Sequence, residues 1–299
     1  MKAMLGLELL DRRVIAVVVD ETGRVVERSE VADANLPAAA ARALAAAVSA
    51  ASTVPTALGI ASHNPDAADC AAVVRALAPK YAGRFATDGA ILAGTAAAVA
   101  EAWAGAGRGA RDVVYFAVAE HAVAGLLRDG APLIGAHRRA PVVSWLALNP
   151  VEREDYRKVG CLEAEVAGAG IVRRLVWRVK AGDSSRVQDA VAGDLGAITV
   201  EHVLDAARAG DGVAISVVRD TAKYLGMAAA NLVVIADPAR LVLGGIMATA
   251  KDLLLELVRV ELARRLPPAM MSALTIVPAV LGGDAAAIGA ARLSAAALQ

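Results

Sequence analysis

The stretch MLGLELLDRRVIAVVVDETGRVVERSEV, residues 4–31, decides the fold. Its apolar runs at residues 4–10 and 14–20 are separated by three polar residues, and the turn at residues 21–23 leads into a third run at residues 24–31. Runs of this length, joined by short polar turns, are typical of neighbouring antiparallel strands. The stretch therefore predicts a three-stranded meander at the start of the chain.

Helices and strands are predicted to alternate after this meander. Asn35 is a capping residue, and Pro37 lies in the first turn of the helix that follows, where proline is favoured. The remaining elements of the first half are a helix at 38–51, a strand at 56–61, a helix at 65–78, a short strand near Phe85 and a helix at 93–106.

The same order of elements restarts at residue 112. Apolar and β-branched residues at 112–118 and 122–127 predict a second meander, and Asp129-Gly130 supplies its next turn. The elements predicted after it are helices at 162–179, 183–191, 200–208 and 212–230, a strand at 241–243, a helix at 248–265, a strand at 273–277 and a final helix at 284–298. A repeated half-molecule of this kind predicts two α/β lobes.

Composition limits the class of protein. The chain has 299 residues, 57% of them hydrophobic, and its 31 basic residues balance 31 acidic ones. This length can form two lobes with cores of their own, and zero net charge gives no argument for nucleic-acid binding. Polar residues and prolines interrupt the longest uncharged stretch, residues 43–65, and Glu8 interrupts any signal-like start. We therefore expect a cytoplasmic protein without a membrane span.

Short motifs in the second half resemble those of a known family. They are GCLE at residues 160–163, YLG at 224–226, GG at 244–245 and LGGD at 281–284. With their flanking residues they are similar to the ROK family, whose name stands for repressor, open reading frame, kinase. The resemblance covers nearly the whole chain, although in the first half it rests on spacing more than on identity.

The resemblance implies an α/β, actin-like ATPase (ribonuclease H-like) fold, in which each of two lobes has a mixed sheet flanked by helices. It implies an amino-terminal lobe of residues 1–105 with 284–299, a carboxy-terminal lobe of residues 106–283, and a homodimer formed through the second lobe. The family's repressors add an amino-terminal helix-turn-helix module. Because the first strand already begins at residue 4, direct DNA binding is not expected.

Family members of this size are mostly ATP-dependent kinases of hexoses or amino sugars, and residues that this activity needs are replaced here. The family's phosphate-binding turn, Asp-x-Gly-Gly-Thr, aligns with residues 8–12, where both glycines are lost and Asp11 would repel phosphate. The catalytic aspartate aligns with Ala93, which cannot accept a proton. A second glycine-rich turn aligns with residues 119–125, where Glu120 adds another acid.

The family's zinc site is also replaced. Its histidine aligns with Trp145, and its three cysteines align with Glu154, Tyr156 and Cys161. One soft ligand of four cannot hold structural zinc, so no metal is predicted. Trp145 and Tyr156 are instead expected to pack where the metal lies in the family.

These losses leave the turns, caps and packing glycines of the fold in place, so they indicate a catalytically inactive sugar-kinase fold without a cofactor. We expect a ligand-binding, regulatory or assembly module that takes a small sugar or an anion. One alternative is an ATP-dependent, glucokinase-like sugar kinase in which Asp11, Glu120 or Asp88 serves as the base. Another is a structural subunit that partners an active paralogue. No sequence feature distinguishes this role from that of the ligand-binding, regulatory or assembly module.

The candidate ligand-binding residues fall on turns and loops that would border the interlobe cleft. They are His137, Arg138, Arg12, Glu120, Gly244 and Gly245. The histidine and the guanidinium groups would bind a sugar or an anion, and the alternative is a solvated histidine with surface ion pairs. The two glycines resemble the family's adenosine-side turn, but with the phosphate-binding loops lost a tight strand-to-helix turn is the preferred interpretation.

The other histidines are given structural interpretations. Glu120 beside His121 offers an acid-base pair, although adjacent residues of a strand point to opposite faces. His63 and His202 are interpreted as surface or capping residues, and Cys161 as a core thiol.

Overall fold

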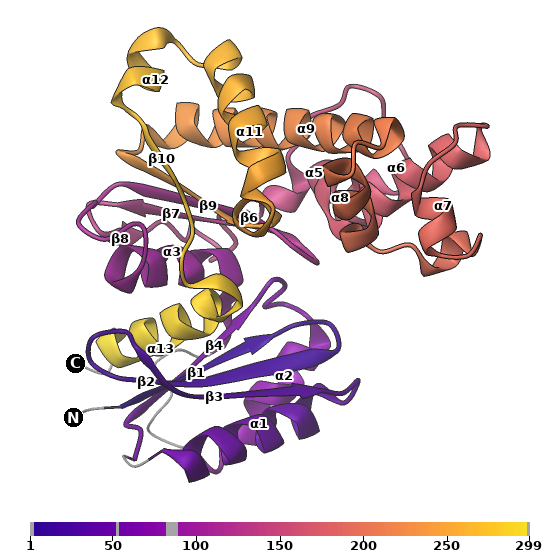
Figure 1. Cartoon of the computed structure of the whole chain (residues 1–299). Coiled ribbons are helices and arrows are strands. Elements are labelled where there is room, and N and C mark those ends of the chain that lie inside the picture. Colours follow the sequence, from indigo (N-terminus) through magenta and orange to yellow (C-terminus); the bar gives the residue numbers. More distant parts are fainter. Residues whose placement is uncertain (1–2, 52–53, 82–88, 298–299) are drawn as a thin grey trace.

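Two five-stranded mixed sheets form the framework of the molecule (Figure 1). The computed structural model describes residues 3–51, 54–81 and 89–297. The strand order is β3-β2-β1-β4-β5 in the first sheet and β10-β9-β6-β7-β8 in the second. Each sheet combines an antiparallel meander with parallel partners, because helical crossovers return the chain in the same direction. The predicted architecture of two mixed sheets flanked by helices is confirmed.

The first sheet contains β1 (Met4–Leu9), β2 (Arg13–Val19), β3 (Val25–Ala32), β4 (Ala57–Ser62) and β5 (Ile91–Leu92). Helices α1 (Leu36–Ala50) and α2 (Ala68–Leu77) cover its outer face. The Asn35 side chain accepts the backbone N–H of Ala38 at 3.2 Å, as its predicted capping role requires. The strand expected near Phe85 lies outside the described residues.

The second sheet contains β6 (Val113–Val118), β7 (Ala122–Arg128), β8 (Ala131–Pro132), β9 (Arg240–Gly245) and β10 (Thr275–Pro278). The main helices on its far side are α5 (Cys161–Val166), α6 (Gly168–Lys180), α8 (Val200–Arg208), α9 (Gly212–Ala236) and α11 (Lys251–Arg265). The largest core of the molecule lies between that sheet and these helices, with Phe116, Leu175 and Leu225 fully buried.

Several predicted helices are divided or shortened. The helix expected at 162–179 is broken by the extended backbone of Ala167, and the one at 248–265 is divided into α10 (Ile246–Thr249) and α11. The helix expected at 183–191 is reduced to α7 (Val187–Ala190). A short helix, α12 (Pro268–Ala273), forms between the elements predicted at 248–265 and 273–277, because proline is suited to a first helical turn. Smaller elements are α4 (Tyr156–Val159), η1 (Val143–Trp145), η2 (Leu195–Ala197) and η3 (Gly282–Asp284).

Two alanine-rich helices, α3 (Ala93–Ala104) and α13 (Ala285–Ala297), lie between the sheets (Figure 1). Helix α3 packs on β6 and β7, α13 packs on β1 and β4, and the two helices pack on each other. A Cβ atom at Gly289 would lie 1.7 Å from the carbonyl oxygen of Ala96, so this crossing requires glycine. The lobe boundaries at 1–105 with 284–299 and at 106–283 stay a prediction. Within the described residues, no helix is long and apolar enough to cross a membrane.

Candidate functional site

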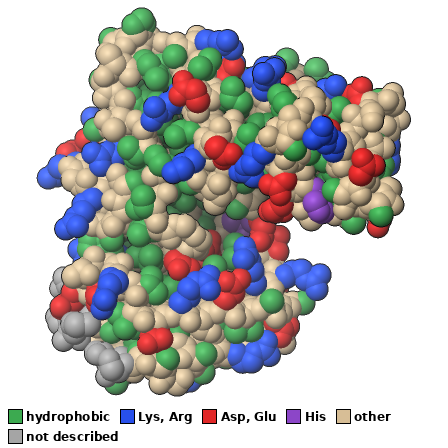
Figure 2. Space-filling view, viewed as in Figure 1, with side chains coloured by type: hydrophobic (Ala, Val, Ile, Leu, Met, Phe, Trp, Pro, Cys, Tyr) green, Lys and Arg blue, Asp and Glu red, His purple; other side chains and the backbone are tan. Residues whose placement is uncertain are grey.

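Two adjoining cavities open between the sheets, with volumes of about 730 and 650 Å³. Both are lined by residues of both halves of the chain, and His63, Ala93 and His121 border the two cavities at once. Figure 2 shows the molecule hollowed between its two halves, with charged side chains of both signs along the opening. Cavities of this size accept small organic ligands.

The first cavity has a polar lining. Asn64 and Asp66 follow β4 on one side, and Arg138, Lys158 and Glu163 line the opposite side. The ring of Trp145, 56% exposed, adds an aromatic surface to the same cavity. Such a mixture of an aromatic face and polar groups of both charges fits a small polar or anionic ligand.

The second cavity has many alanines and glycines in its lining together with carboxylates. Glu8, Glu120 and Glu201 line it, and its basic side chains are Arg13 and the two histidines, His63 and His121. Arg13 is already paired with Glu120 at 2.7 Å and with Glu30 at 3.1 Å. The acidic groups of this cavity therefore oppose the binding of a phosphate group.

Glu8 lies on β1 among these acids. Burial raises the pKa of the Glu8 carboxyl to about 7, Arg13 opposes the rise, and the nearby charges of Asp284 and Glu120 add to it. Because the folded pKa exceeds the ordinary value of 4.5, the folded protein holds this proton more tightly than the unfolded chain does. The resulting stabilisation is complete below about pH 4.5 and is lost as the pH rises through about 7.

Glu8→Gln is therefore expected to stabilise the protein at high pH only. At about pH 8 the free energy of unfolding of the variant should be roughly 2 to 3 kcal/mol higher than that of the natural protein. At about pH 5 the two free energies of unfolding should differ little. Urea unfolding at both pH values measures this difference. Glu21→Gln, at an exposed turn, is the matched control and should show no such pH dependence. An equal difference at both pH values would contradict the prediction.

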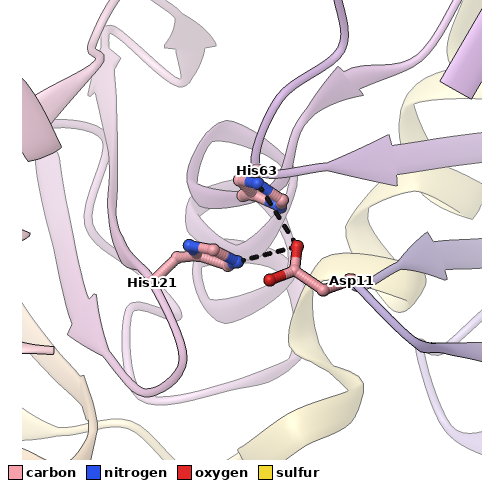
Figure 3. A group of neighbouring side chains, drawn as sticks. All are labelled: Asp11, His63 and His121. Carbon is pink, nitrogen blue, oxygen red and sulfur yellow. Dashed lines mark hydrogen bonds and ion pairs between the residues drawn. The ribbon is translucent and has the colours of Figure 1, made fainter. Parts of the chain in front are cut away.

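Three polar side chains meet at the junction of the two cavities (Figure 3). Asp11 lies in the turn between β1 and β2, His63 directly follows β4, and His121 lies in the turn between β6 and β7. The two imidazole rings are stacked, with centroids 3.6 Å apart and an interplanar angle of 11°. His121 Nε2 lies 3.1 Å from Asp11 Oδ1, and His63 Nε2 lies 3.7 Å from the same oxygen. We call these three residues the junction cluster.

Glu163 fixes the position of His121 in this cluster. Its Oε1 lies 3.1 Å from His121 Nδ1, and its Oε2 accepts the backbone N–H of Ala122 at 3.0 Å. Burial lowers the pKa of His121, but the hydrogen bond to Glu163 and the charges of Glu163 and Asp11 outweigh it, so that the pKa is raised. Burial lowers the pKa of His63, and the neighbouring His121 lowers it further. The His121 ring is thus held between two carboxylates, one from each half of the molecule.

Sequence reasoning did not find the junction cluster. The interpretation of His63 as a surface or capping residue is wrong, because its side chain is 28% exposed and lies in the cleft against His121. The sequence did carry a signal for the cluster, because a polar residue closely follows each of β1, β4 and β6. Ligands of α/β proteins bind at the carboxyl ends of parallel strands, which is where these residues lie. For His202 the capping role is confirmed: its Nδ1 accepts the N–H of Thr199 at 3.1 Å.

A comparison with protein families matches residues 5–297 of the chain to the ROK family. The chain belongs to the ROK family. A glucokinase of Halalkalibacterium halodurans is 32% identical over 64% of this chain and 59% of its own length. The transcriptional dual regulator NagC of Escherichia coli is 28% identical over 53% of this chain and 38% of its own length. The matched regions thus span less than two thirds of these curated relatives.

The fold of the chain is that of ROK structures. A ROK family glucokinase from Streptomyces griseus, solved in complex with glucose and AMPPNP, superposes with a TM-score of 0.81 at 24% identity, over 97% of this chain and 98% of that one. This match confirms the predicted actin-like ATPase fold.

The predicted ligand-binding residues of this ROK protein divide between the two cavities. His137 and Arg138 are exposed and line the first cavity, and Glu120 and Gly245 line the second. Arg12 is exposed and Gly244 is buried, and neither is among the residues that line the two cavities. Their binding roles stay predictions.

The two glycines have a packing role. A Cβ atom at Gly244 would lie 2.6 Å from the Tyr115 hydroxyl, and one at Gly245, where φ is +58°, would lie 1.9 Å from the Val118 carbonyl oxygen. The tight strand-to-helix turn that the sequence offered as an alternative is therefore sufficient to explain both residues.

The segment that the sequence resemblance aligns with the family's zinc site is held by ion pairs and aromatic rings. Tyr156 is buried and its hydroxyl donates to Glu165, while Arg153 donates to Glu165 at 2.9 Å. The Arg153 guanidinium also lies 5.0 Å from the centroids of the Tyr156 and Trp177 rings. The expectation that Trp145 packs here is wrong, because Trp145 is exposed at the first cavity.

Proposed function

We propose that this chain is a ROK protein that binds a small sugar or an anion in its first cavity without phosphorylating it. The observation that carries the proposal is Ala93 at the start of α3, where it borders both cavities. The ROK pattern places the catalytic aspartate at this position, and a methyl group cannot take a proton from a sugar hydroxyl.

The second cavity supports the absence of phosphoryl transfer. Transfer from ATP needs groups that neutralise the charge on the phosphates. Here Glu8, Glu120 and Glu201 border that cavity, and the guanidinium of Arg13 is engaged by Glu30 and Glu120. Mg-ATP would meet repulsion where a kinase provides attraction.

The first cavity supports ligand binding. Trp145 offers an aromatic face on which a sugar ring can stack, and Arg138 offers a cationic donor for hydroxyl or acid groups. The homodimer implied by the sequence resemblance stays a prediction, which sedimentation velocity would test.

An ATP-dependent sugar kinase is the second candidate function. The 32% identity to a glucokinase favours it. In a kinase, Asp11, Glu120 or Asp88 would have to replace the missing aspartate as the base.

Thermal shift and ADP release distinguish the two functions. The full chain is heated with a panel of hexoses, amino sugars and sugar acids, with and without Mg-ATP. We expect a shift with a sugar or acid and none with Mg-ATP, since a ligand at a hundred times its Kd stabilises by about 2.7 kcal/mol. Sugar-dependent ADP release in a coupled assay would overturn the proposal and establish the kinase.

Two tryptophan variants locate the ligand. Trp145→Ala should remove the ligand-induced shift, because the ring borders the first cavity. Trp177→Ala is the matched control, since that ring is 50% exposed and lies outside both cavities. Its unfolding temperature should fall through lost contacts with Arg153 and Arg173, while its ligand-induced shift persists.

A further inference from the structure

The junction cluster has the ligand set of a transition-metal site. Two imidazole nitrogens and a carboxylate oxygen lie within 4.8 Å of one another. Two ligand atoms each about 2.1 Å from a tetrahedral cation are about 3.4 Å apart. The distances from Asp11 Oδ1 to the Nε2 atoms of His121 and His63, 3.1 and 3.7 Å, fall on either side of this value.

We propose that Asp11, His63 and His121 bind one zinc-class divalent cation, which joins the two lobes. Asp11 and His63 extend from the first sheet and His121 from the second (Figure 3). A cation held by all three would therefore cross-link the halves of the molecule at the floor of the cleft. Three protein ligands leave the fourth tetrahedral position open, as in catalytic zinc sites, and all three residues line the first cavity.

The surroundings fit a metal site. The Glu163 carboxylate lies 3.1 Å from Nδ1 of His121, and such a contact orients the ring and makes the opposite nitrogen a better ligand. On binding, the cation takes the place of the proton between His121 Nε2 and Asp11 Oδ1, and that proton passes to the solvent.

The imidazole rings can adjust to the cation. They are stacked, so at least one must turn for both lone pairs to converge. Nδ1 of His63 has no hydrogen-bond partner among the described residues, so no such bond resists its rotation. The Asp11 side chain is 58% exposed and is free to follow.

Nitrogen ligands decide which cation is preferred. Imidazole suits zinc, cobalt and nickel, whereas magnesium and calcium prefer oxygen ligands. An excess of Mg²⁺ should therefore leave the bound cation in place. This inference is independent of the proposed function, because it is tested without sugar or nucleotide.

Cobalt titration tests the proposal. The full chain, prepared without a histidine tag and freed of metal by a chelator, is titrated with Co²⁺ and followed by visible absorption. Zn²⁺ binding is then measured by calorimetry. We expect one equivalent of Co²⁺, displaced by Zn²⁺, and an unfolding temperature raised by either ion.

Five single variants, one at each of the four histidines of the chain and one at Glu163, test the ligand set. His63→Gln and His121→Gln should weaken binding by about 100-fold or more, and Glu163→Gln by about 10- to 100-fold with one equivalent retained. His137→Gln and His202→Gln, outside the cluster, are controls with unchanged binding. Circular dichroism confirms that each variant is folded.

Three results would overturn the proposal. They are the lack of a stoichiometric Co²⁺ band in the natural protein, full binding in the folded His63→Gln, His121→Gln double variant, and loss of binding in either control. If only the His121 variant fails to fold, the His63 variant decides, because its side chain extends from the other lobe.

Discussion

Glu101→Ala is expected to lower the free energy of unfolding by about 3 to 5 kcal/mol, the largest effect of a single substitution considered for this protein. Glu101 lies on α3 and its side chain is fully buried. Its Oε1 accepts the backbone N–H groups of Val280 and Leu281, each at 3.0 Å, and its Oε2 accepts that of Ala106 at 2.7 Å. Alanine would leave three donors without their acceptor and a void in place of the carboxylate.

The position of the three hydrogen bonds that Glu101 accepts adds to the expected loss of stability. Val280 and Leu281 belong to the segment between β10 and α13, the point at which the chain returns to the first sheet. Glu101 therefore ties α3 to the start of the last helix, and its loss should loosen the contact between the lobes. Hydrogen exchange at the amides of residues 280 and 281 should become faster in the variant.

Urea unfolding of Glu101→Ala measures the loss of stability. The matched control is Glu256→Ala, an exposed glutamate on α11, which should change stability by less than about 0.5 kcal/mol. Equal losses in the two variants would show that the three backbone contacts contribute nothing.

Gly289→Ala is expected to destabilise the protein by about 3 kcal/mol through a single methyl group. The added Cβ would lie 1.7 Å from the carbonyl oxygen of Ala96, which belongs to the backbone of α3. Backbone atoms cannot turn aside as a flexible side chain does, so α13 and α3 would have to separate. The alanines along both helices would then lose contact with one another.

A second helical glycine supplies the control for Gly289→Ala. Gly212 begins α9, and nothing lies within 4 Å of the position a Cβ would take there. Because glycine is a poor helix former, Gly212→Ala should be neutral or slightly stabilising. An unchanged urea midpoint in Gly289→Ala would contradict the close crossing of α3 and α13.

The predicted strands and helices agree with the structure wherever the local pattern is strong. Alternating apolar runs and short polar turns placed both meanders, and Asn35 with Pro37 placed the start of α1. The breaks at Ala167 and Ala250 were not predicted, because alanine carries no local signal for ending a helix. These breaks depend on how neighbouring helices pack.

The candidate site was predicted only in part. The sequence resemblance aligns Ala93 with the family's catalytic aspartate, which stays a prediction, and the structure places Ala93 at the border of both cavities. The exposure of Trp145 could not be inferred, because a single aromatic residue in an irregular segment is compatible with either core or surface.

The sequence by itself therefore determined most of the elements and the family resemblance, because each of these depends on local pattern. The tertiary structure alone decided that Asp11, His63 and His121 meet. Asp11 and His121 are 110 positions apart along the chain, and their contact exists because two different sheets bring their strand ends to one cleft. Local patterns fix each strand end, but the distance between the sheets depends on tertiary packing, chiefly that of α3 against α13.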